Sequence, residues 1–121
     1  MKKQIESSEL IINKDGSIYH IALRPEDIAD TIILVGDPRR VETVSGFFDR
    51  IELKRHNREF ITHTGYFNKT RITVLSSGIG TDNIDIVVNE LDALVNIDLK
   101  ERIPKDRHTE LKFIRIGTSG A

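Results

Sequence analysis

The sequence predicts an α/β fold built around a mixed sheet. The first observation is a strand, a long amphipathic helix and a second strand in succession over residues 71–116. A helix that connects two strands of one sheet returns the chain to its starting end, so these two strands are parallel. The second observation is a run of strand candidates joined by short turns between residues 51 and 76, which adds antiparallel neighbours. Glycine-containing loops follow several strands, at the end of the sheet where open α/β folds bind ligands.

Length, charge and composition restrict the possible functions. The chain has 121 residues, enough for one domain with a core. Its 18 basic and 19 acidic residues give a net charge of −1, which argues against nucleic acid or an anionic membrane as a partner. There is no cysteine, which excludes disulfides and Cys-ligated zinc. With no apolar stretch of about 18 residues and a polar start, we expect a soluble cytoplasmic protein.

The first elements are expected before residue 50. Residues 1–16 are polar and end in a Lys14-Asp15-Gly16 turn, so they are expected to form an arm outside the core. Residues 17–23 resemble a strand, 24–27 a short helical turn and 31–35 a buried strand. A short amphipathic helix is then indicated by apolar residues at spacings of three, three and one, namely Val41, Val44, Phe47 and Phe48.

The second half is expected to contain three strands, a long helix and a last strand. The strands are expected at 51–55, 59–66 and 71–76, with a hairpin turn at 68–70. The helix is expected over 82–100, because six apolar residues share one side: Ile84, Val87, Val88, Leu91, Leu94 and Val95. Four polar residues are assigned to the opposite side: Asp85, Asn89, Glu90 and Asp92. A charged loop at 101–110 leads into the strand at 111–116, and no function is predicted for the long stretch 96–110.

Two loops have the composition of anion-binding sites. The segment Gly36-Asp37-Pro38-Arg39-Arg40 follows the strand at 31–35 and opens a helix, with Pro38 suited to the first helical position. The segment Arg115-Ile116-Gly117-Thr118-Ser119-Gly120 follows the apolar run of the last strand. Backbone N–H groups, hydroxyls and guanidinium groups are the donors that a phosphate dianion needs. The two loops together predict a protein that handles an oxyanion.

Other familiar sites are not supported by the residues. Gly78-Ile79-Gly80 resembles the start of a dinucleotide fingerprint, but Asn83 stands at the third glycine and the loop follows a late strand. The sequence contains no nucleotide triphosphatase P-loop and no nucleophile elbow. The four histidines, at positions 20, 56, 63 and 108, do not have the spacing of metal ligands. Oxyanion chemistry is therefore the best-supported interpretation.

Four segments in register resemble one family. They are Gly36-Asp37-Pro38-Arg39-Arg40, Asn57-Arg58-Glu59-Phe60, Ser77-Gly78-Ile79-Gly80 and Arg115-Ile116-Gly117-Thr118-Ser119-Gly120. In this order they resemble the amino-terminal half of the nucleoside phosphorylase-I family, and the Tyr19-His20 pair adds similarity to its uridine phosphorylases. The resemblance covers residues 17–121 and implies a three-layer α/β/α sandwich around a mixed sheet. It also implies that the carboxyl-terminal half of that domain is absent from this chain.

The resemblance implies a phosphate-dependent, reversible cleavage of a nucleoside to free base and (deoxy)ribose 1-phosphate. Phosphate would be a co-substrate held by the N–H of Gly36, the guanidinium groups of Arg40 and Arg115, and Thr118, while Arg58 would reach the phosphate of the neighbouring subunit. Arg40, Arg115 and Thr118 would be the catalytic residues. No organic cofactor is expected. Several arginines are needed because the dianion must lose its water and be held facing C1′ of the sugar.

The ribose site and the subunit interface are assigned from the same resemblance. His20 would hydrogen-bond the 5′-hydroxyl of the neighbour's ribose, and Thr118 would also contact the ribose. Glu59, the carbonyl of Ile79 and Asn83 resemble a monovalent cation site, for K⁺, at a dimer interface, with asparagine where similar proteins carry serine. The family implies a homodimer or a homohexamer that binds nucleoside and phosphate.

Three kinds of function stay open. A phosphorylase is favoured by the paired arginine loops, with a purine nucleoside phosphorylase as the alternative, because the residues that recognise the base belong to the absent half. A nucleosidase, a hydrolase of the same fold, is disfavoured because it would not need Arg40, Arg58 and Arg115 together. An inactive truncated fragment that only binds an anion and oligomerises is favoured by the missing half.

Overall fold

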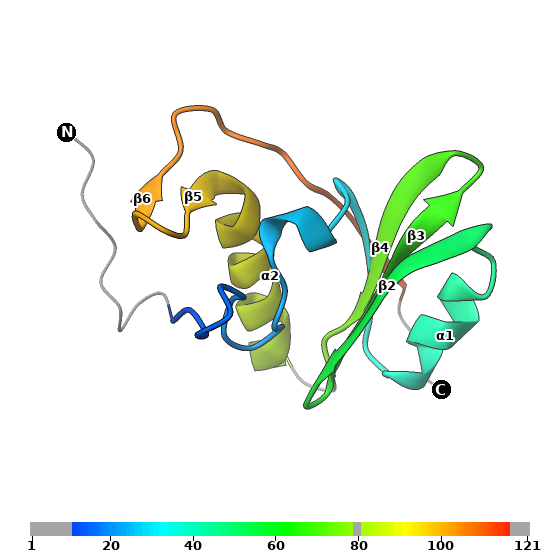
Figure 1. Cartoon of the computed structure of the whole chain (residues 1–121). Coiled ribbons are helices and arrows are strands. Elements are labelled where there is room, and N and C mark those ends of the chain that lie inside the picture. Colours follow the sequence, from blue (N-terminus) through cyan, green and yellow to red (C-terminus); the bar gives the residue numbers. More distant parts are fainter. Residues whose placement is uncertain (1–10, 79–80, 117–121) are drawn as a thin grey trace.

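The computed structural model of the chain describes residues 11–78 and 81–116, and it has the α/β architecture that the sequence predicts (Figure 1). In chain order the elements are the 3-10 helix η1 (Pro25–Asp27), β1 (Thr31–Val35), α1 (Arg39–Ser45), β2 (Arg50–Asn57), β3 (Phe60–Phe67), β4 (Thr70–Ser76), α2 (Thr81–Asn96), β5 (Ile97–Asp98), β6 (Ile103–Pro104) and β7 (Lys112–Ile116). The strands expected from the pattern at 31–35, 51–55, 59–66, 71–76 and 111–116 are all present, with ends that differ by up to two residues.

The main sheet is mixed and has helices on both faces. Its strand order is β2-β3-β4-β1-β7, with β1 parallel to both β4 and β7 and with β3 antiparallel to both β2 and β4. Helix α2 lies on one side of the sheet and α1 on the other, which makes three layers (Figure 1). The chain leaves β4 through α2 and returns at β7, on the far side of β1, so the predicted parallel crossover is confirmed.

The larger part of the core lies between α2 and the sheet. Val87, Leu91 and Leu94 of α2 are fully buried there, as the predicted apolar side of the helix requires. They pack against residues from the sheet and from the segment before it: Ile18, Ile21, Leu23, Ile32, Leu34, Phe60 and Leu75. A smaller cluster, centred on Val35, Val41 and Val74, fills the space under α1. Each face of the sheet is thus covered by one amphipathic helix.

The predicted strand at 17–23 is wrong. In this segment only an isolated bridge joins Ile12 to Ile18, and Ala22 has a positive φ of 56°. The backbone N–H groups of His20 and Ile21 donate to the Glu90 carboxylate on α2 instead of to a neighbouring strand. Residues 11–16, the described part of the expected arm, continue directly into this segment, and Ile12 packs against the larger core cluster.

Helix α2 ends four residues before the expected position at 100. Asn96 is its last residue, and the side chain of Asn96 bonds the backbone of Thr109 in both directions: Nδ2 donates to the carbonyl at 3.0 Å and Oδ1 accepts from the N–H at 2.6 Å. The carbonyl of Asn96 also accepts from the N–H of Lys105. The stretch 96–110 therefore folds back as the short β5–β6 hairpin, and the expected loop at 101–110 contains β6.

Helix α1 is shorter than its apolar pattern indicates. It ends at Ser45, Gly46 is its carboxyl cap, and Phe47 lies beyond it with 73% of its surface exposed. Pro38 directly precedes the helix with helical dihedral angles, so it takes the cap position and not the first helical one. The expected hairpin turn at 68–70 is confirmed, because Asn68 and Lys69 both have positive φ, as a two-residue turn between antiparallel strands favours.

Thr62 on β3 offers a test of the core under α2. Its side chain is fully buried, and its hydroxyl has no hydrogen-bond partner in the described part of the chain. An unpaired buried hydroxyl costs about 1–3 kcal/mol, so Thr62→Val should raise the free energy of unfolding by about 1 kcal/mol. Thr64→Val is the matched control and should lower it, because the Thr64 hydroxyl bonds Asp27 and Thr73. Urea unfolding measures the stability of both variants, and destabilisation by Thr62→Val would show that the Thr62 hydroxyl does have a hydrogen-bond partner.

A buried hydrogen bond joins α1 to the sheet. The Ser45 hydroxyl lies 2.7 Å from Nδ1 of His63, and both residues are buried. Burial lowers the pKa of His63 below its ordinary value of 6.5, and the nearby Lys54 lowers it further, while Glu42 acts in the opposite direction. The folded protein thus favours the neutral ring at this position.

The lowered pKa of His63 predicts a loss of stability in acid. Below about pH 6.5 the unfolded chain binds a proton at this residue more readily than the folded chain, so the contribution of His63 to stability is present above that pH and is lost as the pH falls. One proton difference amounts to at most about 1.4 kcal/mol per pH unit. Urea unfolding at about pH 7.5 and pH 5 should therefore show a smaller acid loss for His63→Gln than for the wild type. An equal loss of unfolding free energy between the two pH values in the wild type and in His63→Gln would contradict the prediction.

Candidate functional site

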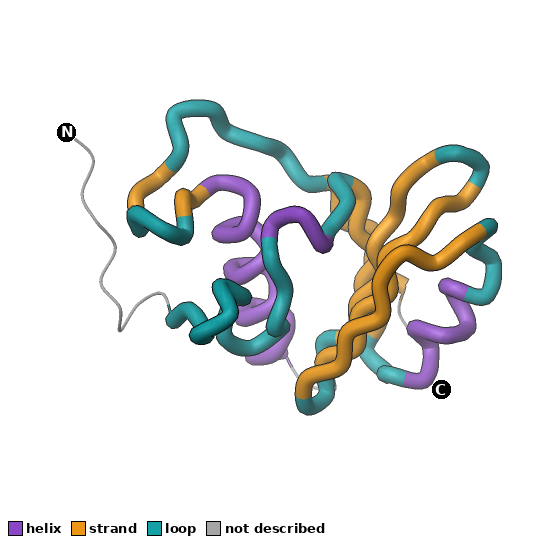
Figure 2. The backbone as a smooth tube through the Cα atoms, in the orientation of Figure 1, coloured by secondary structure: helices purple, strands orange, loops and turns teal. Residues whose placement is uncertain are grey.

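The candidate site lies at the rim where the parallel strands of the sheet end. Val35, the last residue of β1, pairs with Ser76 of β4 and with Ile116 of β7, so the loops after these three strands start at one level. The β2–β3 turn reaches the same end, because the Ser76 hydroxyl donates to the Glu59 carbonyl at 2.8 Å. Figure 2 shows the β1–α1 loop and the β2–β3 turn together at this end of the sheet. The sequence prediction that the glycine loops share one rim is confirmed for the described residues.

The β1–α1 loop holds one arginine in an ion pair and leaves the next one unpaired. Asp37 accepts hydrogen bonds from the backbone N–H and from the guanidinium of Arg39, and this bonding lowers the pKa of the Asp37 carboxyl. Arg40, one position further along, is exposed; its backbone N–H donates to the Asp37 carbonyl, but its side chain forms neither a hydrogen bond nor an ion pair with the described residues. Gly36 lies close to the next loop, since a Cβ atom at Gly36 would be 3.6 Å from the Gly78 carbonyl oxygen.

The three arginines predicted to bind phosphate share this unpaired state. Arg40, Arg58 and Arg115 are all exposed, and none has a side-chain hydrogen bond or ion pair within the described residues. Most other arginines are engaged: Arg24 with Asp15, Arg39 with Asp37, Arg55 with Asp27, Arg71 with Glu52, and Arg50 over the Tyr66 ring. The rim therefore carries guanidinium groups that are available to an anion.

The predicted phosphate residues approach the rim from different elements. Arg115 on β7 pairs in register with Leu34, whose side chain belongs to the core under α2, whereas Arg40 belongs to α1 on the opposite face. Arg58 lies in the β2–β3 turn with a positive φ of 55° and accepts a hydrogen bond from His56 at its carbonyl. Within the described residues, no hydrogen bond links any two of these three arginines. Thr118 lies outside the described residues.

Two of the predicted cation ligands meet at Gly78. This glycine has a φ of +78°, and a Cβ atom there would be 2.9 Å from Cγ of Glu59 and 3.0 Å from Nδ2 of Asn83. Only glycine tolerates this combination of dihedral angle and close approach. Ile79, the third predicted ligand, lies outside the described residues. Over residues 11–78 and 81–116, no group of three or more His, Asp or Glu side chains is arranged to hold a metal ion.

His20 is held beside the rim by two elements. Its carbonyl accepts a hydrogen bond of 2.6 Å from the Asn57 side chain at the end of β2, next to Arg58. Its ring Nδ1 lies 2.7 Å from the Glu90 carboxylate on α2. The sequence interpretation that Glu90 faces away from the core is wrong, since its side chain is 13% exposed. The sequence signal that indicates this inward position is the place of Glu90 next to Leu91, at the edge of the apolar side of α2.

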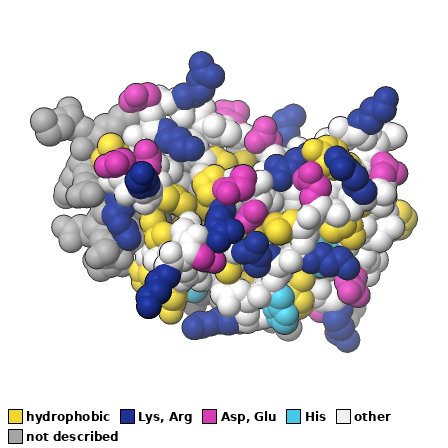
Figure 3. All heavy atoms as spheres, viewed as in Figure 1, with side chains coloured by type: hydrophobic (Ala, Val, Ile, Leu, Met, Phe, Trp, Pro, Cys, Tyr) yellow, Lys and Arg dark blue, Asp and Glu magenta, His cyan; other side chains and the backbone are white. Residues whose placement is uncertain are grey.

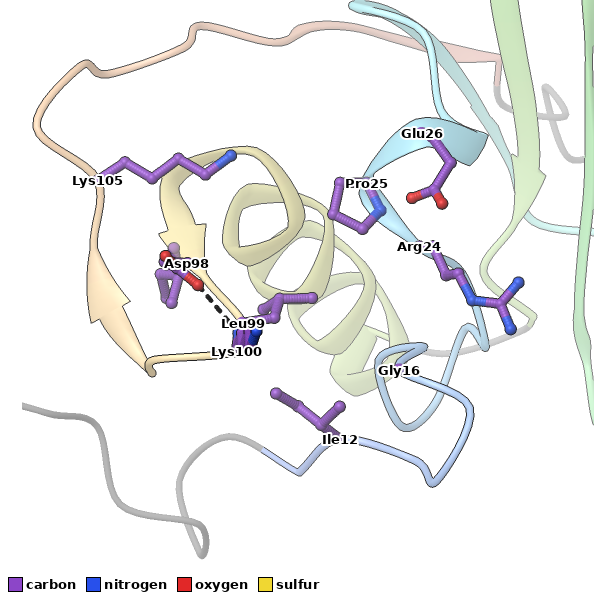
Figure 4. A pocket seen from close by; sticks show the side chains of 10 residues that line it. Ile12, Gly16, Arg24, Pro25, Glu26, Asp98, Leu99, Lys100 and Lys105 are labelled. Carbon is purple, nitrogen blue, oxygen red and sulfur yellow. Dashed lines mark hydrogen bonds between the residues drawn. The ribbon is translucent and has the colours of Figure 1, made fainter.

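A separate cavity of about 450 Å³ lies away from the rim, between the amino-terminal turn, η1 and the β5–β6 hairpin. Figure 4 shows that its lining includes the apolar side chains of Ile12 and Leu99 and the charged side chains of Asp98 and Lys105. None of the predicted site residues lines this cavity. The Arg24 guanidinium is engaged with Asp15, and opposite charges are mixed around the opening, so the cavity does not have the donor set of an oxyanion site.

The surface charge on the face seen in Figure 3 does not favour a particular macromolecule. On the face seen in Figure 3, basic and acidic side chains are interspersed without a broad area of one sign. Neither of the α-helices in the described residues has the length and hydrophobicity needed to cross a membrane.

Comparison with known proteins shows the family. The family model of the phosphorylase superfamily matches residues 30–121, and the chain belongs to this superfamily. The chain is 35% identical over its whole length to a uridine phosphorylase of Thermococcus kodakarensis, of which it covers 39%. It is 35% identical over 85 residues to a DeoD-type purine nucleoside phosphorylase of Roseobacter denitrificans, with 69% of this chain and 36% of that protein covered.

The structure of a Trypanosoma brucei nucleoside phosphorylase, described as showing uridine phosphorylase activity, superposes with a TM-score of 0.84. The two chains are 38% identical over 93% of this chain and 39% of the trypanosomal chain. The three-layer fold with a mixed sheet is thus the fold of nucleoside phosphorylases. The chain spans about two fifths of the length of these relatives.

Proposed function

We propose that this chain supplies the phosphate site of a nucleoside phosphorylase of the uridine phosphorylase type. The reaction is the reversible attack of phosphate on C1′ of a nucleoside, which yields free base and (deoxy)ribose 1-phosphate. The similarity to uridine phosphorylases over the whole chain supports this choice. The observation that carries it is the set of three exposed arginines without side-chain partners, Arg40, Arg58 and Arg115, on elements that begin or end at one rim.

The arginines are suited to the chemistry of a phosphate dianion. Each charge-assisted hydrogen bond contributes about 1.5–3 kcal/mol, and fixed placement of the nucleophile adds several more. In this proposal Arg40 and Arg115 bind the attacking phosphate with the N–H of Gly36 and with Thr118. As the bond to the base stretches, the sugar gains positive charge, and the bound dianion stabilises it. Arg58 extends to the phosphate of a neighbouring subunit.

The other assignments complete a shared site. His20 binds the 5′-hydroxyl of the neighbour's ribose, and Thr118 contacts the ribose of its own subunit. Glu59, Ile79 and Asn83 hold a monovalent cation at the interface; the approach of Glu59 and Asn83 at Gly78 supports this part. Because residues of one subunit serve the site of another, we propose a homodimer or homohexamer. We place the enzyme in the cytoplasm and in nucleoside salvage.

A purine nucleoside phosphorylase is the second candidate, favoured by the similarity to the Roseobacter denitrificans protein. The two candidates share the phosphate chemistry and differ in the base. A nucleosidase is disfavoured, because water as the nucleophile does not require three arginines. Anion binding without turnover is the remaining alternative, and it is favoured by the coverage of only 39% of the Thermococcus kodakarensis protein.

The test measures base release from uridine, thymidine and inosine, with and without phosphate. It uses the 121-residue chain and a chimera in which the part of the Thermococcus kodakarensis protein that this chain does not cover follows Ala121. We expect phosphate-dependent release of uracil by the chimera. Equal release without phosphate would indicate a nucleosidase, and preferential release from inosine would indicate a purine enzyme. No release from any nucleoside by a folded chimera would reject the proposal.

A further inference from the structure

Glu90 of α2 is an inward-facing carboxylate that the proposed reaction does not use. It accepts hydrogen bonds from the backbone N–H groups of His20 and Ile21, each at 3.0 Å to Oε1. Its Oε2 atom lies 2.7 Å from Nδ1 of the His20 ring. One carboxylate therefore holds both the backbone and the side chain of the residue proposed to bind the ribose.

The surroundings of His20 also restrict its ring. The Tyr19 ring meets it edge to face at a centroid distance of 4.8 Å, and the Phe60 ring does so at 6.4 Å. The Asn57 side chain fixes the His20 carbonyl from β2. The His20 side chain is 31% exposed, and its Nε2 atom makes no hydrogen bond with the described residues. The ring is thus oriented by its neighbours and has one nitrogen left for a ligand.

The position of Glu90 determines which nitrogen carries the proton in the neutral ring. An ionised carboxylate only accepts hydrogen bonds, so Nδ1 must be the donor. The hydrogen bond made by one ring nitrogen decides the state of the other, and Nε2 is left with a free lone pair. A lone pair at Nε2 accepts a hydrogen bond from a hydroxyl group but offers no donor to an ether or to a carbonyl.

We infer that Glu90 is a positioning residue that holds His20 as the Nδ1–H tautomer and so presents Nε2 as an acceptor for a sugar hydroxyl. The inference deepens the proposed function and rests on it for the identity of that hydroxyl, the 5′-hydroxyl of a nucleoside. The tautomer itself follows from the contacts of His20 and Glu90 alone. The arrangement selects nucleosides with a free 5′-hydroxyl over 5′-deoxynucleosides.

The tautomer is tested on the chain itself by long-range proton–nitrogen correlation NMR at about pH 8, above the ordinary pKa range of histidine. His20→Gln assigns the signals. We expect Nδ1–H with a bare Nε2 in the wild type and in the control Asp85→Asn, an exposed acid on the same helix. Glu90→Leu should lose this preference. An Nε2–H wild type, or an unchanged tautomer in Glu90→Leu, overturns the inference, and the wild-type spectrum decides alone if the variant does not fold.

The link to substrate is tested in the chimera with uridine and 5′-deoxyuridine. Glu90→Leu should lower kcat/KM for uridine by about two- to tenfold, the range of one neutral hydrogen bond, with little change for 5′-deoxyuridine or for the phosphate KM. Glu90→Gln keeps one acceptor oxygen, so its kcat/KM for uridine should lie between the values of the wild type and of Glu90→Leu. Equal losses on both nucleosides would show a merely structural role and overturn the inference. A chimera without phosphorolysis rejects the proposed function and leaves the tautomer result standing.

Discussion

Arg40→Ala and Arg115→Ala are each expected to reduce phosphorolysis by at least about tenfold in the chimera. In the proposed site each substitution removes a guanidinium from the attacking dianion, and a charge-assisted hydrogen bond exceeds the 1.4 kcal/mol that corresponds to a factor of ten. Because both side chains lack partners in the described residues, their removal should not disturb the fold. The loss should appear in the phosphate KM as well as in kcat.

Arg39→Ala is the matched control for this prediction. Arg39 neighbours Arg40, has a side chain that is 91% exposed, and is paired with Asp37. Its removal takes away the same charge from the same helix without touching the proposed contacts, so phosphorolysis should change less than about twofold. An equal loss in Arg39→Ala and Arg40→Ala would show that only the general positive charge of the loop matters.

Gly65→Ala is expected to destabilise the fold by at least about 2 kcal/mol, which is about a thirtyfold change in the folding equilibrium. Gly65 lies on β3 where the pairing with β2 changes register between Ile51 and Leu53. A Cβ atom there would be 2.8 Å from a ring carbon of Phe48 and closer still to the Arg50 carbonyl oxygen. The backbone of β2 would have to move, which disrupts the hydrogen bonds of the edge strand.

Gly46→Ala is the control for the glycine prediction. Gly46 has an ordinary φ of −61°, and a Cβ atom there would lie 3.2 Å from the Glu42 carbonyl oxygen and 3.5 Å from that of Thr43, without a severe clash. Its free energy of unfolding should change by less than about 1 kcal/mol. Urea unfolding of both variants measures the difference. A Gly65→Ala variant as stable as Gly46→Ala would contradict the close packing of β2 on β3.

Local patterns predicted the elements whose signals repeat along the sequence. The helix α2 follows from apolar residues at helical spacing, and the parallel pairing of β1, β4 and β7 follows from the crossover that contains it. The hairpin at Asn68 and Lys69 follows from turn residues between two strands. These features depend on neighbours in the sequence, which is why they can be derived without coordinates.

Features that depend on distant partners could not be predicted in this way. The segment 17–23 has the composition of a strand, but the backbone of His20 and Ile21 bonds to Glu90, about 70 positions further on. The end of α2 depends on Asn96 bonding Thr109 across a hairpin. Phe47 fits the apolar side of α1 by spacing and is exposed because the helix stops before it.

In the candidate site, too, some features follow from the sequence and others depend on contacts that only the structure shows. The convergence of the loops on one rim follows from the strand order, and the residue types at Gly36, Arg40 and Arg115 indicate an oxyanion ligand. That Arg40 is unpaired while Arg39 is bonded to Asp37 depends on side-chain geometry and could not be derived from the sequence. The role of Glu90 behind His20 also required the structure.

The most direct test of the two-loop phosphate site is a proton–nitrogen NMR titration of the 121-residue chain with phosphate, at constant ionic strength maintained with chloride. We predict saturable shifts of the Gly36 amide and of the Arg40 and Arg115 side-chain signals that share one dissociation constant. Arg40→Ala should weaken that constant at least about tenfold for the Arg115 signal as well, because one anion joins the two loops. Shifts that do not saturate, or that give unrelated constants at the two loops, would contradict the account.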